Sequence, residues 1–207
     1  MPRRCPPPGR SPSTDARPRS AQTPRLLEAH PLAPTSFGTT GVPARDVQTV
    51  QPTGEAVARR IDGVVIKPLV THVDERGSVC ELYHPDWAYH ADPLVYVEYV
   101  TIRPGKIKGW VVHEQQDDRG VVGYGTIQVA LYDGRAGSPT FGLVNEFCFS
   151  EANRALFTVP QGVWHAVRNV GVTDALFINM PTRAYDHAAP DKHRLPVDTD
   201  AIPYVWR

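Results

Sequence analysis

Short apolar and alternating runs recur from about residue 60 onward, and turn-forming residues separate them. The clearest run, residues 94–102, is rich in β-branched and aromatic residues and is closed by Pro104 and Gly105. Another run covers residues 125–132 and is followed by an Asp-Gly pair. Many short strands with frequent turn signals are typical of antiparallel sandwiches and barrels. We therefore predict an all-β fold.

The remaining apolar runs support the same fold class. No amphipathic pattern extends over three helical turns, and only residues 151–154 have the composition of a single helical turn. No apolar run approaches the roughly 18 residues that a membrane helix needs, so we expect no membrane contact. The further predicted strands lie at residues 63–66, 147–149, 155–159, 163–167 and 175–179.

The N-terminal quarter of the chain has a different composition. Eleven of the 21 prolines fall in the first 52 residues, and arginines there outnumber acidic residues while large apolar groups are few. Such a segment buries too little apolar surface to offset its conformational entropy. We predict a disordered tail over residues 1–55 and a folded domain over residues 56–207. An organelle transit peptide would have a similar composition and stays an alternative.

Charge and cysteine content narrow the classes of partner. The formal net charge is zero at pH 7, so no basic surface for nucleic acid or anionic membrane is indicated. Cys5, Cys80 and Cys148 are too widely spaced for a disulfide framework or a zinc motif. We expect a cytoplasmic protein that binds no nucleic acid.

The most specific motif begins at Pro160 and reads P-x-G-x-x-H-x-x-x-N, with His165 as its histidine and Asn169 as its last residue. Pro and Gly form a tight turn that delivers His165 to the following strand. The motif resembles the second sequence motif of the cupin superfamily. The resemblance implies a cupin jelly roll, a β-sandwich or barrel that holds a ligand in its mouth.

The first cupin motif normally supplies two histidines and a later carboxylate to a metal ion. Here His113 is present, but the second histidine position is Gln115. Asp117 or Asp118 could complete a site with His113 and His165, because imidazole and carboxylate together bind iron, zinc or manganese. An amide is a weak ligand, so we expect no metal and no cofactor. A metal-dependent cupin remains an alternative.

The H-x-Q pattern at His113 is similar to that of the dTDP-4-dehydrorhamnose 3,5-epimerases. These are metal-free dimeric cupins of sugar-nucleotide metabolism. The resemblance rests on D-x-R-G-x-x-x-E at residues 74–81, on Ser-Pro-Thr-Phe-Gly at residues 138–142, and on a terminal I-x-x-x-W at residues 202–206. It covers about residues 60–207. It implies a homodimer that binds a small nucleotide-sugar-like molecule.

The resemblance also implies roles for single residues. His113 would be the base that takes a proton next to a ketone, and Asp198 would orient it. The family's enolate-stabilising lysine falls near Asp118, where Arg119 could supply the charge instead. The family's reprotonating tyrosine falls on Asn179, with Tyr185 six residues later. The expected catalytic residues are therefore His113, Arg119, Asp118, Asn179, Tyr185 and Asp198.

The expected substrate-binding residues come from the same comparison. Arg76 and Glu81 hold positions that reach the nucleotide, partly across the dimer interface. Trp110 replaces an arginine that contacts the diphosphate, and Lys108 is the nearest cation. Gln115 and His165 should line the mouth of the barrel. The expected set is Arg76, Glu81, Lys108, Trp110, Gln115 and His165.

One long polar segment, residues 181–196, has no counterpart in a typical epimerase. Loops of this length are often functional, as lids are, although a solvated C-terminal wrap would look the same.

Taken together, these patterns favour an epimerase or other isomerase acting on a 4-keto-6-deoxy sugar nucleotide or a similar keto compound. A metal-dependent cupin and a non-catalytic sugar-nucleotide binder are the alternatives.

Overall fold

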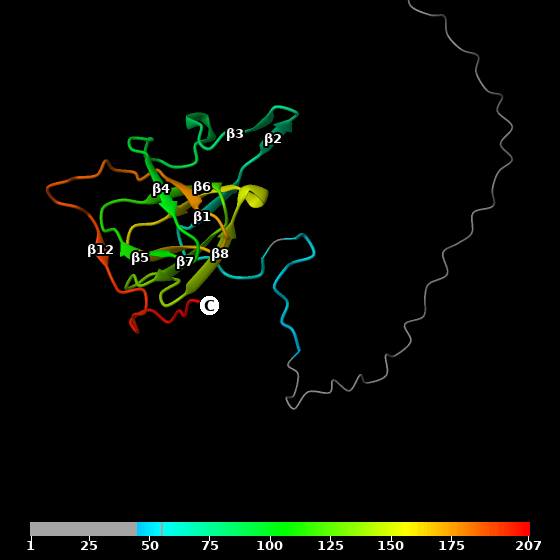
Figure 1. Cartoon of the computed structure of the whole chain (residues 1–207). Helices are drawn as coiled ribbons and strands as arrows, with labels where there is room; N and C mark the ends of the chain where they lie inside the picture. Colours follow the sequence, from blue (N-terminus) through cyan, green and yellow to red (C-terminus); the bar gives the residue numbers. More distant parts are fainter. Residues whose placement is uncertain (1–44, 55) are drawn as a thin grey trace, which may run out of the picture. The chain divides into compact units, whose positions relative to one another are not determined.

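Two antiparallel five-stranded sheets pack face to face in the computed structural model (Figure 1). The first sheet has the order β1-β9-β6-β11-β4, so neighbouring strands come from distant parts of the chain. This is the mixed connectivity of a jelly roll rather than of a meander. Its strands are β1 (Val65–Pro68), β9 (Ala155–Val159), β6 (Asp118–Tyr124), β11 (Ala175–Asn179) and β4 (Glu98–Ile102).

The second sheet has the order β12-β5-β10-β7-β8. The last strand in sequence, β12, pairs with β5, so the C-terminal segment closes one edge of this sheet. The predicted all-β fold is confirmed. The strands are β12 (His193–Arg194), β5 (Ile107–Val112), β10 (Val163–Asn169), β7 (Ile127–Asp133) and β8 (Val144–Phe149).

The structure describes residues 45–207 except residue 55. Residues 48–207 form one unit that contains both sheets. Nearly all of the tail predicted over residues 1–55 lies outside the described residues, so that prediction stays open. Among the described residues, no helix has the length and apolar character that crossing a membrane requires.

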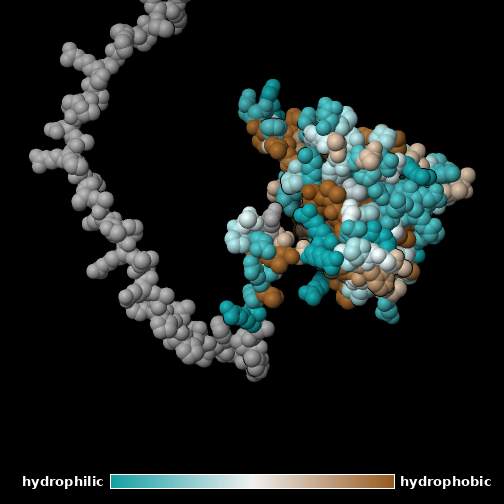
Figure 2. Space-filling model, turned by 180° about the vertical axis from the view of Figure 1, so that it is seen from behind, coloured by the Kyte–Doolittle hydropathy of each residue, from teal (hydrophilic) through white to brown (hydrophobic). Residues whose placement is uncertain are grey.

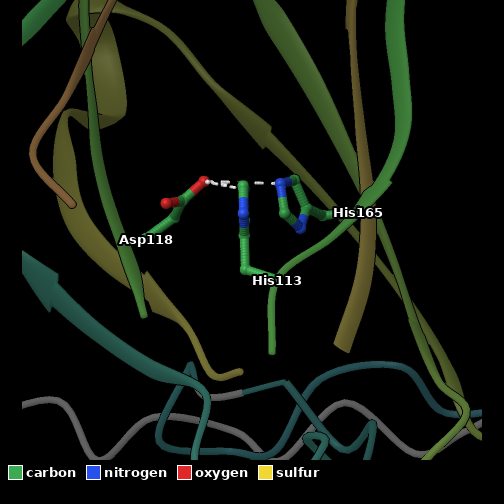
Figure 3. Close-up of side chains that lie close together, drawn as sticks. All are labelled: His113, Asp118 and His165. Atoms are coloured by element: carbon green, nitrogen blue, oxygen red, sulfur yellow. Dashed lines mark ion pairs between the residues drawn. The ribbon is translucent and has the colours of Figure 1, made fainter. Parts of the chain in front are cut away.

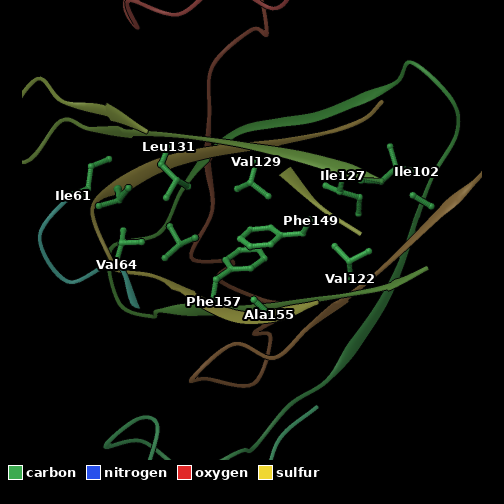
Figure 4. Close-up of a cluster of buried hydrophobic side chains, with 13 residues drawn as sticks. Ile61, Val64, Ile102, Val122, Ile127, Val129, Leu131, Phe149, Ala155 and Phe157 are labelled. Atoms are coloured by element: carbon green, nitrogen blue, oxygen red, sulfur yellow. The ribbon is translucent and has the colours of Figure 1, made fainter. Parts of the chain in front are cut away.

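The space between the two sheets is filled by apolar side chains from both (Figure 4). Alternation along β7 sends Ile127, Val129 and Leu131 into this layer, as expected for a strand with period two. Phe149 from the second sheet stacks on Phe157 from the first, with ring centroids 5.0 Å apart. Aromatic stacking across the layer joins the two sheets.

Both outer faces are covered as well. Trp110, Ala130 and Ala166 form a buried cluster on the outside of the second sheet, against the C-terminal residues Tyr204 and Trp206. A third cluster, which covers the outside of the first sheet, contains Val121, Leu156 and Met180, with residues 82–89 packed against it. The central strands are therefore buried on both faces.

A separate hairpin, β2 (Thr71–Asp74) and β3 (Gly77–Cys80), projects beyond the sandwich (Figure 1). Its Val73 and Val79 are 77% and 68% exposed. Seen from behind, the projecting part of the unit carries apolar groups beside polar ones (Figure 2). The hairpin thus leaves apolar surface uncovered in a single copy of the chain.

Two features differ from or refine the expected elements. The run at residues 94–102 becomes a strand only from Glu98, because β4 is an edge strand and its preceding residues are largely exposed. The single helical turn expected at residues 151–154 is present as the 3-10 helix η2 (Glu151–Asn153). A second 3-10 helix, η1 (Pro85–Trp87), lies in the covering segment.

Candidate active site

His113 follows the last residue of β5 and is 6% exposed. Its Nδ1 contacts the backbone carbonyl of Asp191, which can only accept a hydrogen bond. Nδ1 is therefore assigned the hydrogen, and Nε2 of the neutral ring carries the lone pair. The Asp191 carboxylate also accepts the backbone N–H groups of Glu114 and Gln115, at 2.9 and 2.8 Å. Asp191 thus fixes both the ring and the backbone after it.

His165 lies on β10 in the middle of the second sheet, opposite Val111 of β5. Its Nδ1 is 3.2 Å from the carbonyl of Val163, so the same assignment leaves its Nε2 with the lone pair. The His113 and His165 rings stack with centroids 5.4 Å apart. The tight turn at Pro160 and Gly162 therefore delivers His165 to the site, as the motif predicts.

Asp118 is the first residue of β6, on the opposite sheet, and is buried. Its Oδ2 lies 3.4 Å from Nε2 of His113 and 3.4 Å from Nε2 of His165 (Figure 3). Its Oδ1 accepts a hydrogen bond from the side chain of Gln116 at 2.9 Å. Two imidazoles and a carboxylate from three strands thus converge on one point.

Burial and nearby charged groups shift the pKa values of these side chains in opposite directions. Burial would raise the pKa of Asp118, but His113 and His165 lower it well below its usual range. Burial would lower the pKa of His113, yet the Asp118 carboxylate and the Asp191 carbonyl raise it above 6.5, with Lys192 opposing them. Asp118 therefore stays ionised, and it makes His113 a stronger base.

The three side chains line a cavity of about 410 Å³ between the sheets. A second hollow of about 230 Å³ adjoins it beneath the segment at residues 181–196. Four residues line both and so mark the passage between them: Glu98, His113, Asn179 and Lys192. A cavity of this size that combines apolar walls with converging polar side chains fits a small-molecule site.

The segment at residues 181–196 supplies groups that the sequence did not reveal as site residues. Lys192 lines both hollows and lies close enough to affect the pKa of His113, and Arg194 lines the inner one. Tyr185, an expected catalytic residue, lines the outer hollow together with Tyr96. The one available signal for the other residues was the length of this polar segment, which left a lid and a solvated wrap as alternatives. Its side chains reach the site because β12 pairs with β5.

Arg119 is placed differently from the expectation that it stabilises an enolate. It is fully buried, and its guanidinium donates to the backbone carbonyls of Asp92, Pro93, Met180 and Pro181 at 2.8–3.2 Å. Successive residues of a strand face opposite sides, so Asp118 faces the cavity and Arg119 faces away. Arg119 therefore lies outside both hollows and anchors two loops, and its expected catalytic role stays a prediction.

Trp110 and Asp198 also lie away from the cavity. The Trp110 indole is 1% exposed and packs on Tyr204 at 5.8 Å on the outer face of the second sheet. Asp198 lines a separate hollow formed by the C-terminal segment, while Asp191 provides the contact to His113. The structure thus places Trp110 and Asp198 outside the cavity, and their expected roles stay predictions.

The other expected residues divide between the cavity and the surface. Lys108 lines the inner cavity and Gln115 lines the outer hollow. The Oδ1 of Asn179 has no hydrogen-bond partner among the described residues. An amide has no acidic hydrogen, so Asn179 cannot replace the hydroxyl of a tyrosine as a proton donor. Arg76 pairs with Asp74 in the projecting hairpin, and Glu81 lines a different hollow; neither residue lines the cavity of its own chain.

Comparison with known proteins agrees with the resemblance. Residues 58–206 match the model of the family described as dTDP-4-dehydrorhamnose 3,5-epimerase. A probable low-salt glycan biosynthesis epimerase, Agl13 of Haloferax volcanii, is 37% identical over 148 residues, which cover 70% of this chain and 94% of the relative. The spore coat polysaccharide biosynthesis protein SpsL of Bacillus subtilis is 36% identical over 146 residues, covering 70% and 96%.

Solved structures show the same fold. The crystal structure of a dTDP sugar isomerase from Desulfovibrio desulfuricans G20 superposes with a TM-score of 0.67 at 26% identity, covering 70% of this chain and 92% of that one. ChmJ, a 3'-monoepimerase from Streptomyces bikiniensis solved in complex with dTDP-quinovose, gives a TM-score of 0.63 at 22% identity, covering 70% and 76%.

Proposed function

We propose, from the premise that this chain belongs to the dTDP-4-dehydrorhamnose 3,5-epimerase family, that it epimerises a 4-keto-6-deoxy sugar carried on a nucleotide. The observation that carries the proposal is the state of His113. Its Nδ1 is held by the Asp191 carbonyl, so its Nε2 carries the lone pair, and the side chain lines the cavity between the sheets. A fixed neutral imidazole on a cavity wall suits a general base.

The proposed reaction begins with Nε2 of His113 removing the proton from the carbon next to the ketone. The imidazolium that forms lies beside the Asp118 carboxylate, 3.4 Å away, which stabilises its charge. The electron pair of the broken C–H bond moves to the ketone oxygen and forms an enolate. Asp118 therefore supports proton abstraction although it stands where the family has a lysine.

The enolate oxygen needs a positive partner. Lys192 lines both hollows beside His113, so we assign it the role first expected of Arg119. An ammonium group aimed at the developing oxyanion lowers the barrier through electrostatic stabilisation. Because Lys192 comes from the segment at residues 181–196, this segment forms part of the proposed site.

Return of the proton from the opposite face decides the stereochemical outcome. Asn179 occupies the position of the family's tyrosine and has no acidic hydrogen at neutral pH. Tyr185 and Tyr96 line the outer hollow and are the candidate acids. Because both candidate acids lie in the outer hollow and neither lines the inner cavity, epimerisation at a single carbon is the simpler outcome.

We also propose that a homodimer completes nucleotide binding. Arg76 lies on the projecting hairpin and does not line the cavity of its own chain. The hairpin also exposes Val73 and Val79. A second copy of the chain that buries these valines would bring the hairpin of one copy against the other.

Size-exclusion chromatography with light scattering tests the dimer. Arg76→Ala should raise KM for the nucleotide sugar while leaving kcat nearly unchanged.

The decisive test is incubation of chelator-treated enzyme with dTDP-4-keto-6-deoxyglucose in deuterium oxide. Deuterium should enter C3 or C5 of the sugar, and His113→Gln should abolish the incorporation. His84→Asn is the matched control, because His84 is half exposed and the asparagine keeps its cap on η1. If folded wild-type protein incorporates no deuterium, the proposed reaction is excluded. Tight dTDP binding without exchange would instead identify a non-catalytic binder.

A further inference from the structure

Three hydrogen-bond acceptors converge at the point where His113, His165 and Asp118 meet. Both histidines have Nδ1 against a backbone carbonyl, so each neutral ring directs its Nε2 lone pair at Asp118 Oδ2. A carboxylate oxygen also only accepts. With both rings neutral, these contacts contain no hydrogen to share. Either a proton on one ring or a metal cation between the three atoms therefore satisfies the arrangement.

The separations fit a metal ion better than they fit hydrogen bonds. Both Nε2–Oδ2 distances are 3.4 Å, longer than the usual range of about 2.7–3.2 Å for such hydrogen bonds. Ligands at about 2.0–2.2 Å from a tetrahedral ion stand roughly 3.3–3.6 Å from one another. The three ligand atoms all lie within 4.8 Å of each other. A small inward movement of one ring would complete the coordination.

We propose that His113, His165 and Asp118 bind one divalent transition-metal ion of the Zn²⁺ class. Two imidazoles and one carboxylate are the donors that such ions prefer, whereas Ca²⁺ and Mg²⁺ require more oxygen ligands. The fourth coordination position opens on the cavity of about 410 Å³. Two neutral ligands and one anionic ligand leave an ion with a net positive charge facing that cavity.

The surrounding contacts support this assignment. In metal sites a ligating histidine donates its other ring N–H to a carbonyl or carboxylate, as the Asp191 and Val163 carbonyls allow here. The second oxygen of Asp118 is held by Gln116 at 2.9 Å, which directs the first at the histidines. The neighbouring Asp117 is occupied elsewhere, 2.9 Å from His90. Asp118 is therefore the carboxylate of the site.

The ion and the proposed base reaction exclude each other. Nε2 of His113 has one lone pair, which either binds the ion or takes the substrate proton. Bound metal should therefore suppress epimerisation, and this consequence rests on the proposed function while the binding itself does not. The site would make the enzyme sensitive to free transition metal.

Metal binding is tested first without substrate, on chelator-treated full-length protein. Titration with Zn²⁺ by calorimetry should give one ion per chain, and Co²⁺ should produce the visible absorption of a four-coordinate ion. Asp118→Asn and His165→Gln should each weaken Zn²⁺ binding by more than about 100-fold, since even outer partners of a ligand are worth roughly 10–100-fold. Asp117→Asn is the matched control and should bind as wild type does.

The outcomes separate the two proposals. Absence of Zn²⁺ binding at micromolar concentration, or binding unchanged in folded Asp118→Asn and His165→Gln, overturns the metal site and leaves the epimerase proposal standing. Zn²⁺ should then suppress deuterium exchange in proportion to its occupancy. Exchange that is unaffected by bound Zn²⁺, or that requires it, overturns the exclusion and removes His113 as the base.

Discussion

Two buried aspartates show how differently one protein uses the same side chain. Asp133 ends β7 and Asp118 begins β6; both are buried, and surrounding groups lower the pKa of each against the effect of burial. Asp133 accepts hydrogen bonds from Arg135 at 2.9 Å and from the hydroxyls of Ser138 and Thr140 at 2.6 Å. Asp118 has one donor, Gln116, and otherwise faces two ring nitrogens.

The difference separates a carboxylate that stabilises the fold from one that is available to bind a ligand. A carboxylate saturated with donors has no remaining capacity to bind a ligand, and it rigidifies the turn around it. An unsaturated one in a cavity is available to a proton or an ion. The Ser-Pro-Thr-Phe-Gly stretch at residues 138–142, a specific sign of the family, supplies the Asp133 network. This stretch therefore identifies the fold rather than the reaction.

The largest effect should follow from removing the saturated carboxylate. Asp133→Ala leaves Arg135 and two hydroxyls without their acceptor, so we expect the free energy of unfolding to fall by about 3–5 kcal/mol, typical of a broken buried pair. Urea denaturation measures it. Asp74→Ala breaks the exposed pair with Arg76 and should lower the free energy of unfolding far less, because solvent screens an exposed ion pair. Equal losses in the two variants would contradict the assignment.

A loss of about 2–4 kcal/mol is expected for Arg119→Lys. Lysine cannot reach the four carbonyls that Arg119 serves, and charged hydrogen bonds contribute about 1.5–3 kcal/mol each. Deuterium exchange per folded molecule should stay near the wild-type rate. A stable variant that loses exchange would return Arg119 to the catalytic set.

Part of the stability from Asp133 should disappear in acid. Its pKa is lowered in the folded protein, since Arg135, Ser138 and Thr140 stabilise the ionised form. The contribution is therefore complete above the unfolded pKa of about 3.9 and is lost as pH falls toward the lower folded value. Urea midpoints between pH 6 and pH 2 should fall more steeply for wild type than for Asp133→Ala. Parallel curves would argue against the network.

The smallest change in stability is expected for Asp118→Ala, the counterpart of Asp133→Ala. It removes a charge that faces two lone pairs and loses one hydrogen bond from Gln116, so the metal-free protein should change by less than about 1 kcal/mol at pH 8. Exchange activity and Zn²⁺ binding should both fall sharply. A loss as large as that of Asp133→Ala would remove the distinction between the two carboxylates.

The fold and half of the site follow from local patterns. Alternation and turn residues act over a few residues, so they predict the strands and the turn that leads into His165. The contact of His165 with His113 depends in addition on the pairing of β10 with β5. The direction of Arg119 depends on which face of β6 meets the cavity, which a motif match does not report. Lys192 enters the site through the pairing of β12 with β5, a contact between distant segments that no local pattern encodes.

The contact between Asp191 and His113 spans 78 residues of sequence, which has a consequence for biosynthesis. At roughly 5–20 residues per second, a ribosome takes about 4–16 s to make Asp191 after it has made His113. During that interval the nascent chain holds His113 without the carbonyl that selects the tautomer of its ring. The chain therefore acquires this part of its chemistry only after most of its strands have been made.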